Sequence, residues 1–505
     1  MIAKQLIEPK SIVVVGGSDD IHKPGGTVLR NLQDGNFKGS LYVVNPKMDE
    51  VQGIKAYRDV KDLPEVDCAI LAIAAKFCPS TVEVLAKQKN TKAFIILSAG
   101  FHEENEEGAK LERQIVETIN SVGGSLIGPN CIGVLTNHYS GVFTSPIPEL
   151  NPQGVDLISG SGATALFIMD SGMQKGIKFN SMYSVGNSAQ LGVEEILEYM
   201  DESFDPKTSS RVKLLYVESI EKPEKLLKHA SSLIRKGCRI AAVKSGGSAA
   251  GSRAASSHTG ALASSDVAVE ALFRKAGIVR CNGRDELMTV AGIFMHPEMK
   301  GRNMAVVTHA GGPAVMLTDA LSNGGMDVPH IEGEKAQELL GKLFAGSSVG
   351  NPIDFLATGT AEQLGYILDA CDRDFDNIDG MAVIFGSPGL FPVFDVYNVL
   401  DEKMKTSKKP IFPIFPSSKI VKDEIAEFVS KGRVYFPDEV LFGNALCKIY
   451  KTPAPQPEHF EMPDMDVKKI REVVDNAQNG YLSPDEIHAL LDAAGVARAK
   501  DGVSD

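Results

Sequence analysis

Residues 11–20, SIVVVGGSDD, contain a pattern that the rest of the chain repeats. An uninterrupted β-branched run fills residues 12–15, the glycines Gly16 and Gly17 follow at once, and a helix-like stretch begins near Gly26. Apolar runs without polar alternation are typical of strands that are buried on both faces, as in parallel sheets covered by helices. The stretch therefore predicts one strand–turn–helix step of a doubly wound α/β domain.

The same step recurs in three successive units, which predicts an α/β protein with three doubly wound parallel-sheet domains. In such sheets ligands bind at the carboxyl ends of the strands, where the glycine turns lie. Helices are expected at about 222–236 and 262–276 in the second unit. The predicted strands lie within residues 11–20, 39–47, 66–75 and 91–101 of the first unit, 155–159, 179–186, 212–219 and 238–246 of the second, and 303–308, 380–388, 409–417 and 432–438 of the third.

Composition excludes several classes of protein. The chain has 505 residues and a net charge of −13, so it lacks the basic footprint of a nucleic-acid binder. It has no apolar tract of about 18 residues or more, which predicts no membrane span. The N-terminus shows no signal-peptide cleavage site. Seven scattered cysteines without a C-x-x-C pair indicate reduced thiols in a cytoplasmic protein.

The turn at Gly16 and Gly17 favours a phosphate-bearing ligand. Glycines there allow the backbone to approach phosphate, and the following helix offers free N–H groups and the positive end of its dipole. The turn is not G-x-G-x-x-G, and the second strand ends in Asn45–Pro46–Lys47 instead of an acidic residue for a ribose diol. Coenzyme A fits Lys47 better than NAD does, although a solvated loop lysine is the alternative.

Two further turns of small residues open the second and third units. Gly160–Ser161–Gly162 and Gly311–Gly312–Pro313 each follow a predicted strand and precede a helix, and proline suits the first helical turn. Two helix N-termini, one from each domain, would suit one anion held between them. Each turn taken alone is interpreted as a purely structural turn.

The C-terminal part differs from the three units. Residues 451–466 are rich in proline and acidic side chains and are interpreted as a linker. Helices are predicted near 467–477 and 484–494, the second with Ser483 as N-cap, Pro484 at the first position and Glu486 at the third.

With these residues in hand, the chain resembles the NDP-forming acyl-CoA synthetases, or ADP-forming acetate–CoA ligases, which are relatives of succinyl-CoA synthetase. The resemblance implies a Rossmann-like CoA-binding domain at 1–145, two flavodoxin-like ligase domains at 146–298 and 299–450, and a tail at 451–505. It covers about residues 10–450 and rests above all on GPNCIGVL (128–135), ISGSGATA (158–165), SVGNSA (184–189), KSGGSAAGSRAASSHTGALA (244–263), THAGGPAVMLTDA (308–320) and NPIDFL (351–356).

The resemblance implies a reversible reaction in three steps. Acyl-CoA and phosphate give an acyl phosphate and CoA, the phosphoryl group passes to a histidine, and the phosphohistidine passes it to ADP. The histidine is that of SSHTG, here His258, which the resemblance places on a movable loop because it serves two sites in turn. Imidazole suits this role because one ring nitrogen is nucleophilic near neutral pH. Glu218 in LYVES matches the glutamate that fixes the imidazole's tautomer.

The remaining site residues are assigned by the same resemblance, and none is assigned to a metal. For the phosphoryl transfer, helix N-termini would stabilise charge on the transferring oxygens. The residues expected at CoA are Gly16, Gly17, Ser18, Lys47, Ser98, Ala99 and Gly100. Those expected around phosphate and substrate are Ser161, Gly162, Asn187, Lys244, Gly311 and Gly312.

The chain departs from the family pattern at three places. His309 stands where the family usually has asparagine, Gly160 stands where it commonly has glutamine, and no ATP-grasp domain follows residue 450. ATP or ADP with Mg²⁺ would bind only to an ATP-grasp subunit or domain outside this chain, and an oligomer is expected. LSPDEIHALLDAAGVARA (482–499) looks like the opening of that domain in fused family members.

Two alternatives to the enzyme therefore stay open. One is a CoA-binding regulatory module without turnover, which the departures at His309 and Gly160 favour. The other is a nicotinamide-dependent dehydrogenase, which the residues after the second strand disfavour. The carboxylic acid that is activated and the direction of the reaction are not determined by the sequence.

Overall fold

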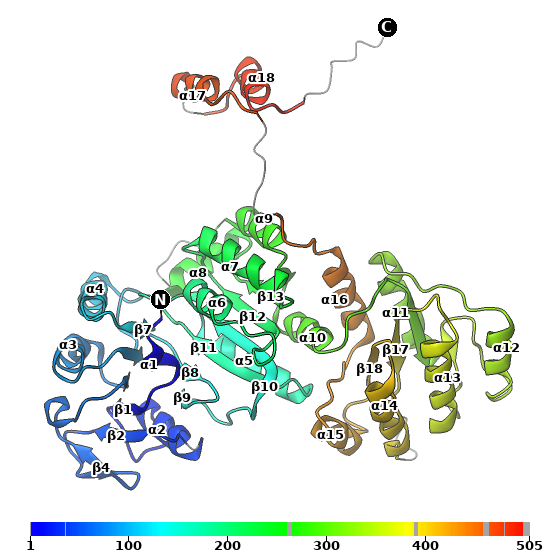
Figure 1. Ribbon diagram of the computed structural model, residues 1–505, viewed down its shortest axis with the longest axis horizontal. Coiled ribbons are helices and arrows are strands. Elements are labelled where there is room, and N and C mark those ends of the chain that lie inside the picture. The colour runs from blue at the N-terminus through cyan, green and yellow to red at the C-terminus, as the bar shows by residue number, and fades with distance from the viewer. Residues whose placement is uncertain are drawn as a thin grey trace. The chain divides into compact units, whose positions relative to one another are not determined.

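The computed structural model describes residues 2–35, 37–259, 265–387, 392–457, 464–478 and 480–497, with the side chains of 255–259 left out (Figure 1). The chain divides into two compact units, Met1–Pro455 and Gln456–Asp505. The first unit holds three sheets, each surrounded by helices. This arrangement confirms the predicted α/β class with three sheet domains, while the exact domain limits stay a prediction.

The first sheet is buried on both faces, as its β-branched strands predict. Its order is β3-β4-β2-β1-β5-β6-β7, parallel except for the antiparallel β3–β4 pair. On β1, Ile12 and Val14 join one apolar cluster with α2, while Val13 and Val15 join another with α3 and α4. The elements are α1 (Lys4–Ile7), β1 (Ser11–Val15), α2 (Pro24–Asp34), β2 (Ser40–Val44), β3 (Glu50–Val51), β4 (Ile54–Tyr57), β5 (Cys68–Leu71), α3 (Cys78–Gln88), β6 (Ala93–Ile96), α4 (Glu106–Ser121) and β7 (Ser125–Ile127).

The second sheet, in the order β14-β13-β12-β10-β11-β8-β9, contains all four predicted strands as its parallel centre. It differs from the prediction at one edge, where β8 and β9 run antiparallel. The turn between them, closed by Thr136 N–H to Tyr139 C=O at 3.0 Å, is too short for a crossover. The elements are β8 (Gly133–Leu135), β9 (Ser140–Val142), β10 (Leu150–Ser159), α5 (Gly162–Gln174), β11 (Phe179–Ser184), α6 (Val193–Glu202), β12 (Val212–Val217), α7 (Pro223–Arg235), β13 (Arg239–Lys244), α8 (Ala249–Thr259), α9 (Asp266–Ala276), β14 (Val279–Cys281) and α10 (Arg284–Phe294).

The segment around His258 is helical in its backbone, because His258 lies in α8, so the expectation of a loop is wrong at this position. Alanines at 249, 250, 254 and 255 favour a helix, and Ser248 caps it by accepting a hydrogen bond from Gly251 N–H at 3.0 Å. The helix predicted at 262–276 is α9, which begins at Asp266, and residues 262–264 lie outside the described residues.

The third sheet has the order β16-β15-β17-β18 and is parallel. Residues 432–438, predicted as a strand, contribute only one bridge, between Phe436 and Ile414. Around that bridge, Phe436 N–H donates to Pro413 C=O at 2.9 Å and Phe415 N–H donates to Phe436 C=O at 2.8 Å, whereas Tyr435 N–H donates to Lys175 C=O at 3.2 Å. The elements are β15 (Met304–Thr308), α11 (Gly311–Asn323), α12 (Glu334–Leu340), β16 (Ile353–Asp354), α13 (Ala361–Arg373), β17 (Gly380–Ile384), α14 (Phe394–Thr406), β18 (Ile411–Ile414), α15 (Lys422–Ser430) and α16 (Glu439–Lys451).

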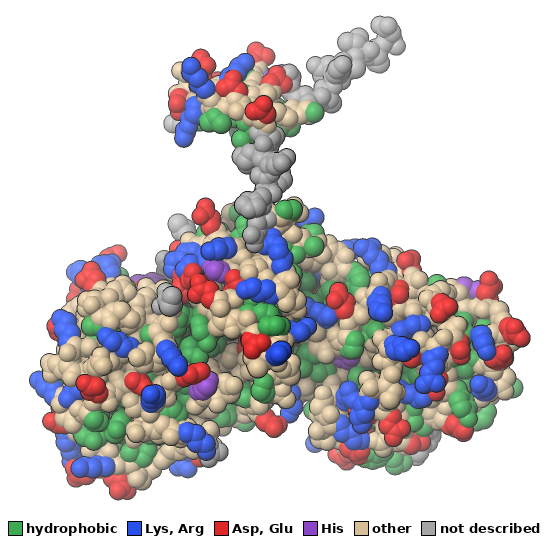
Figure 2. Space-filling view, viewed as in Figure 1, with side chains coloured by type: hydrophobic (Ala, Val, Ile, Leu, Met, Phe, Trp, Pro, Cys, Tyr) green, Lys and Arg blue, Asp and Glu red, His purple; other side chains and the backbone are tan. Residues whose placement is uncertain are grey.

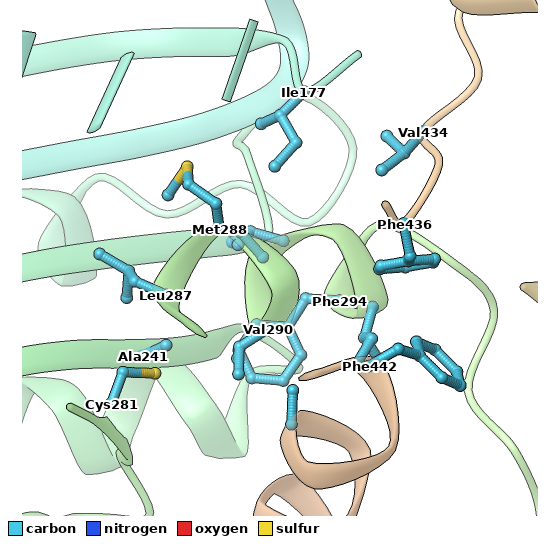
Figure 3. Packing of buried hydrophobic residues seen from close by; sticks show 14 of the residues in the cluster. Ile177, Ala241, Cys281, Leu287, Met288, Val290, Phe294, Val434, Phe436 and Phe442 are labelled. Atoms are coloured by element: carbon cyan, nitrogen blue, oxygen red, sulfur yellow. The ribbon is translucent and has the colours of Figure 1, made fainter. Parts of the chain in front are cut away.

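Helix α10 joins the second and third sheets into one apolar core. Leu287, Met288, Val290 and Phe294 of α10 are buried together with residues of both sheets (Figure 3). The other labelled members are Ile177, Ala241 and Cys281 on one side and Val434, Phe436 and Phe442 on the other. Burial on both sides explains why this helix is apolar around most of its circumference.

The second unit, at the C-terminus, contains the two predicted helices, α17 (Val467–Asn476) and α18 (Pro484–Ala493). The predicted cap of α18 is confirmed, because Ser483 Oγ accepts from Glu486 N–H at 3.3 Å and Glu486 returns the bond. Among the helices that the structure describes, none combines the length and apolar character needed to cross a bilayer. Acidic and basic side chains are interspersed over the face that Figure 2 shows.

Candidate active site

A cleft of about 630 Å³ lies between the first and second sheets. Its lining comes from segments that follow β6 and β7 of the first sheet and β10, β11 and β12 of the second, as expected for a ligand site of parallel sheets. Both apolar and polar side chains contribute to the lining. The apolar part includes Leu97, Ile132, Phe143, Val193 and Val217, and the polar part includes His102, Glu112, Asn130, Ser161, Asn187, Glu194, Glu218 and Glu221.

The N-terminus of α5 borders this cleft and is shaped by small residues. Ser161 caps the helix by accepting from Thr164 N–H at 3.3 Å, and its own carbonyl accepts from Ser159 Oγ at 2.7 Å. A side chain at Gly162 would place its Cβ 2.5 Å from Ile132 Cγ2, so this position requires glycine. Free N–H groups and the positive end of the helix dipole favour an anion here. Both predicted residues, Ser161 and Gly162, therefore lie at one candidate anion site.

Glu218 lies at the end of β12 and lines the same cleft. Its carboxylate accepts a hydrogen bond from the Tyr216 hydroxyl at 3.3 Å. Burial is the main cause of the raised pKa of Tyr216, so its hydroxyl stays protonated and can donate at neutral pH. The carboxylate is thus positioned at the cleft, as required for a group that orients another side chain.

Asn187, after β11, connects the two sheets across the cleft. Its Nδ2 donates to Glu103 Oε2 at 2.5 Å and to Glu112 Oε2 at 3.2 Å, and Glu112 Oε1 lies 2.7 Å from His102 Nδ1. Burial disfavours the charged form of Glu103, but the bonds from Asn187 and the backbone N–H groups of Gly100 and Phe101 outweigh it and lower the pKa of Glu103. The amide of Asn187 is therefore committed to carboxylates.

Glu103, Glu112 and His102 were not among the predicted site residues. Glu103 belongs to the loop after Gly100, whereas Glu112 is on α4 and Asn187 is 75 residues further on. No motif joins residues at such separations, so only the pairing of the two sheets brings them together.

The residues expected at CoA lie at the carboxyl end of the first sheet and not in the lining of the cleft. Gly16 has φ +86°, and a Cβ there would lie 2.5 Å from Ala72 O, so the turn requires glycine. Asn45 Nδ2 ties the end of β2 to Gly17 O at 2.8 Å. Lys47 in that same segment is exposed.

The other turn expected at CoA follows β6, next to the cleft residue Leu97. Ser98 Oγ donates to Ile73 O at 2.5 Å, and Gly100 adopts φ +105°. The strands β1, β2, β5 and β6 are parallel neighbours, so the turns that follow them lie at the same end of the sheet. This end therefore holds the turn at Gly100, the turn with Ser18 after β1 and the turn with Lys47 after β2. Their contacts with CoA stay a prediction.

The structure does not bring Lys244, Gly311 and Gly312 into the lining of this cleft. Lys244 ends β13 and is buried, its Nζ donates to Gly246 O at 2.9 Å, and burial lowers its pKa. Gly311 begins α11 at the third sheet. The expectation that the helices α5 and α11 share one anion stays a prediction.

Two histidines named from the sequence have different outcomes. The side chain of His258 lies outside the described residues, so its distance to Glu218 is not part of the structure. His309 Nε2 accepts from Gly386 N–H at 2.9 Å, and its ring centroid lies 4.3 Å from that of Phe385. Burial lowers the pKa of His309, which keeps the imidazole neutral. This side chain therefore links the ends of β15 and β17.

Comparisons with protein families divide the chain in agreement with its sheets. Residues 10–137 match the CoA binding domain, and residues 152–294 match the succinyl-CoA ligase like flavodoxin domain. The first match confirms the expectation of coenzyme A as the cofactor. The second covers the strands and helices that carry Ser161, Asn187 and Glu218.

Curated relatives and solved structures extend the likeness to most of the chain. It is 32% identical over 431 residues to the acetate–CoA ligase [ADP-forming] II subunit alpha of Pyrococcus furiosus, covering 84% of this chain and 92% of that one. It is 35% identical to acetate–CoA ligase [ADP-forming] I of Archaeoglobus fulgidus, with coverage of 74% of this chain but 54% of the relative. It thus spans nearly the full alpha subunit but about half of the longer ligase.

A solved structure agrees with these relatives. The dinucleotide forming acetyl-coenzyme A synthetase 1 of Ca. Korarchaeum cryptofilum, in complex with phosphate and ADP, superimposes with a TM-score of 0.79 at 26% identity, covering 88% of this chain and 96% of that one. The chain therefore belongs to the family of ADP-forming acetate–CoA ligases, acid–thiol ligases whose alpha subunits it matches over nearly their full length.

Proposed function

We propose that this chain performs the CoA-side half of an ADP-forming acyl-CoA ligase reaction. In the first step, an oxygen of phosphate attacks the thioester carbonyl carbon and the C–S bond breaks, giving acyl phosphate and CoA. In the second, a ring nitrogen of His258 attacks phosphorus and the carboxylate leaves. Both steps are reversible, and the substrate class is a CoA thioester of a carboxylic acid.

The observation that carries this proposal is the shared cleft. Ser161 and Gly162 at the N-terminus of α5, together with Glu218, line it beside segments of the sheet that matches the CoA binding domain, which supports an anion site there. Such a joint site is what a reaction between a CoA thioester and phosphate requires. Helix N–H groups at Gly162 and Ala163 would stabilise charge on the phosphoryl oxygens, and Glu218 would fix the tautomer of His258.

The last step needs a nucleotide, which we assign to an ATP-grasp subunit or domain that binds ADP or ATP with Mg²⁺. The alpha-subunit character of the relatives supports this division of labour. In the described ranges, no group of three or more His, Cys, Asp or Glu side chains is arranged to hold a metal ion. A cytoplasmic location is supported by the seven cysteines, all free and buried.

Radiolabelled phosphate tests the proposal. The full chain, incubated with acetyl-CoA and labelled inorganic phosphate, should acquire an acid-labile label, and His258→Asn should abolish it. His138→Asn, at a histidine beside Glu8 and outside the cleft, is the matched control and should label normally. If wild type takes no label from a panel of acyl-CoAs yet binds CoA by calorimetry, the chain is a CoA-binding module without turnover. If His258→Asn labels as well as wild type, the assignment of the phosphorylated residue is wrong.

A further inference from the structure

The pair His102–Glu112 lies at the wall of the cleft, in the part contributed by the CoA-binding sheet. His102 is in the loop between β6 and α4, and its Nδ1 is 2.7 Å from Glu112 Oε1 on α4. The side chains are 31% and 12% exposed, so the acid is covered and the imidazole reaches solvent. Because Nδ1 is committed to Glu112, Nε2 is the ring atom left for a ligand. Asn187 holds the other oxygen of Glu112 at 3.2 Å.

The cleft around this imidazole is acidic. Its lining contains the carboxylates Glu112, Glu194, Glu218 and Glu221 and, in the part of the chain that the structure describes, no lysine or arginine. Glu103 also faces His102 from the same loop. Glu194 is committed to the backbone N–H groups of Glu221 and Lys222, at 2.9 and 3.1 Å.

Two neighbours decide how the imidazole of His102 titrates. The hydrogen bond to Glu112 raises the pKa of His102, burial opposes it, and the charges of Glu112 and Glu103 raise it further. An ordinary histidine has a pKa of about 6.5, so His102 retains its proton at higher pH than an isolated imidazole. The other candidate donor, the Cys131 thiol, has a pKa raised to about 12 by burial, which makes it a poor acid.

The first step of the proposed reaction leaves an electron pair on the sulfur of CoA. His102 follows the Ser98–Ala99–Gly100 turn by two residues, and that turn is one of those expected at CoA. We propose that His102 is the acid that protonates the departing CoA sulfur and, in the reverse direction, the base that takes the proton from the CoA thiol. This inference rests on the proposed function and adds a catalytic residue to it.

Cleavage of the thioester transfers one electron pair and one proton to the CoA sulfur. A phosphate oxygen forms a bond to the carbonyl carbon, the C–S bond breaks, and the electron pair of that bond stays on sulfur. The proton moves from Nε2 of His102 to sulfur, which leaves His102 neutral beside the Glu112 carboxylate. Hydrogen phosphate releases its own proton to water as the acyl phosphate forms, and a proton from water returns to Nε2, so the step is balanced and the enzyme is ready for the next acyl-CoA.

Two phosphoryl donors separate this role from the rest of the reaction. Acetyl-CoA with phosphate requires sulfur chemistry before His258 is labelled, whereas acetyl phosphate labels His258 directly. In His102→Gln, labelling from acetyl-CoA and phosphate should slow by about 10²-fold, the lower range for general acid catalysis, because a thiolate is a tolerable leaving group. Labelling from labelled acetyl phosphate should stay within about twofold of wild type. His138→Gln, outside the cleft, should resemble wild type with both donors.

The pH profile supplies a second readout. Glu112→Gln removes the partner that raises the pKa of His102, so the alkaline limb of acetyl-CoA-driven labelling should move to lower pH. Equal losses from both donors in His102→Gln would overturn the proposal in favour of anion binding or structure, and an unchanged acetyl-CoA rate would overturn it outright. A wild-type chain that takes no label from acetyl phosphate would instead overturn the proposed function itself.

Discussion

Replacing Lys213 by methionine should loosen the strands that present Ser161 and Glu218 to the cleft. Lys213 on β12 lies in register beside Asp156 on β10, with Nζ 2.5 Å from Oδ2. The side chains are only 2% and 4% exposed. The second oxygen of Asp156 accepts from Asn180 Nδ2 at 2.7 Å and Ser181 Oγ at 2.6 Å. In Lys213→Met the carboxylate keeps these neutral donors but loses its cationic partner.

The expected loss of stability in Lys213→Met follows from the burial of the Asp156–Lys213 ion pair. Leaving one member of a buried ion pair without its partner costs about 3–5 kcal/mol. The two retained donors place Lys213→Met near the lower end, at about 3 kcal/mol, or roughly 10²-fold in a local opening equilibrium. The double variant Asp156→Asn with Lys213→Met removes both charges at similar volume. It should therefore recover about 2 kcal/mol of that loss through coupling between the two sites.

Hydrogen exchange followed by mass spectrometry measures the local opening of β10 and β12. A local measurement is needed because a chain with several sheets does not unfold in one step. Amides of β10 and β12 should exchange about 10²-fold faster in Lys213→Met and within about tenfold of wild type in the double variant. Amides of β1, in the first sheet, are the internal reference and should not change. Unchanged exchange in the single variant, or equal exchange in the single and double variants, would refute the argument from buried charge.

Three further predictions concern turns and pH. Gly162→Ala should reduce labelling of the chain by acetyl phosphate at least about tenfold, because its Cβ would lie 2.5 Å from Ile132 Cγ2 at the candidate anion site. Gly160→Ala is the control and should stay active, because the nearest atom to its Cβ, Tyr216 O, is 3.8 Å away. Gly16→Ala should weaken CoA binding in calorimetry, and Gly53→Ala, also at positive φ but with open space around it, should not. Burial lowers the pKa of His296 to about 4, so unfolding takes up a proton below about pH 6.5. The stability of the folded chain should therefore fall as the pH drops from 6.5 towards 4. In thermal melting, His296→Phe should show a shallower fall than wild type.

The long strands were predictable because the apolar residues that become buried are consecutive in the sequence. Residues 12–15 are an unbroken β-branched run, residues 155–159 are apolar except for Asp156 and Ser159, and both became central parallel strands. The β8–β9 hairpin was not predictable, because its three-residue strands carry no recognisable period; β8 owes its place to pairing with β11, and β9 to pairing with β8. The helix at His258 was hidden by a different cause, since its serines and glycines masked the helical preference of the alanines.

Some residues of the candidate site were predictable from the sequence and others were not. Ser161 and Glu218 lie within two residues of the ends of β10 and β12, so their place at the carboxyl end of the sheet followed from the strand prediction. His102 and Glu112 meet because a loop and a helix turn toward each other, and Asn187 reaches them from another sheet. That contact depends on tertiary packing, which no local pattern contains.

Among the described residues, the lining of the cleft contains no lysine or arginine, which has a consequence for the proposed reaction. A site lined with lysine and arginine would bind phosphate tightly in the ground state, and such uniform binding lowers KM without accelerating the chemical step. In the proposed reaction, the carboxylates of the cleft would oppose tight phosphate binding, while the fixed N–H groups of α5 would stabilise charge that develops during transfer. A phosphoryl group that must leave for a nucleotide on another module is best held in this way, because a deep energy well at the first site would stall the second transfer.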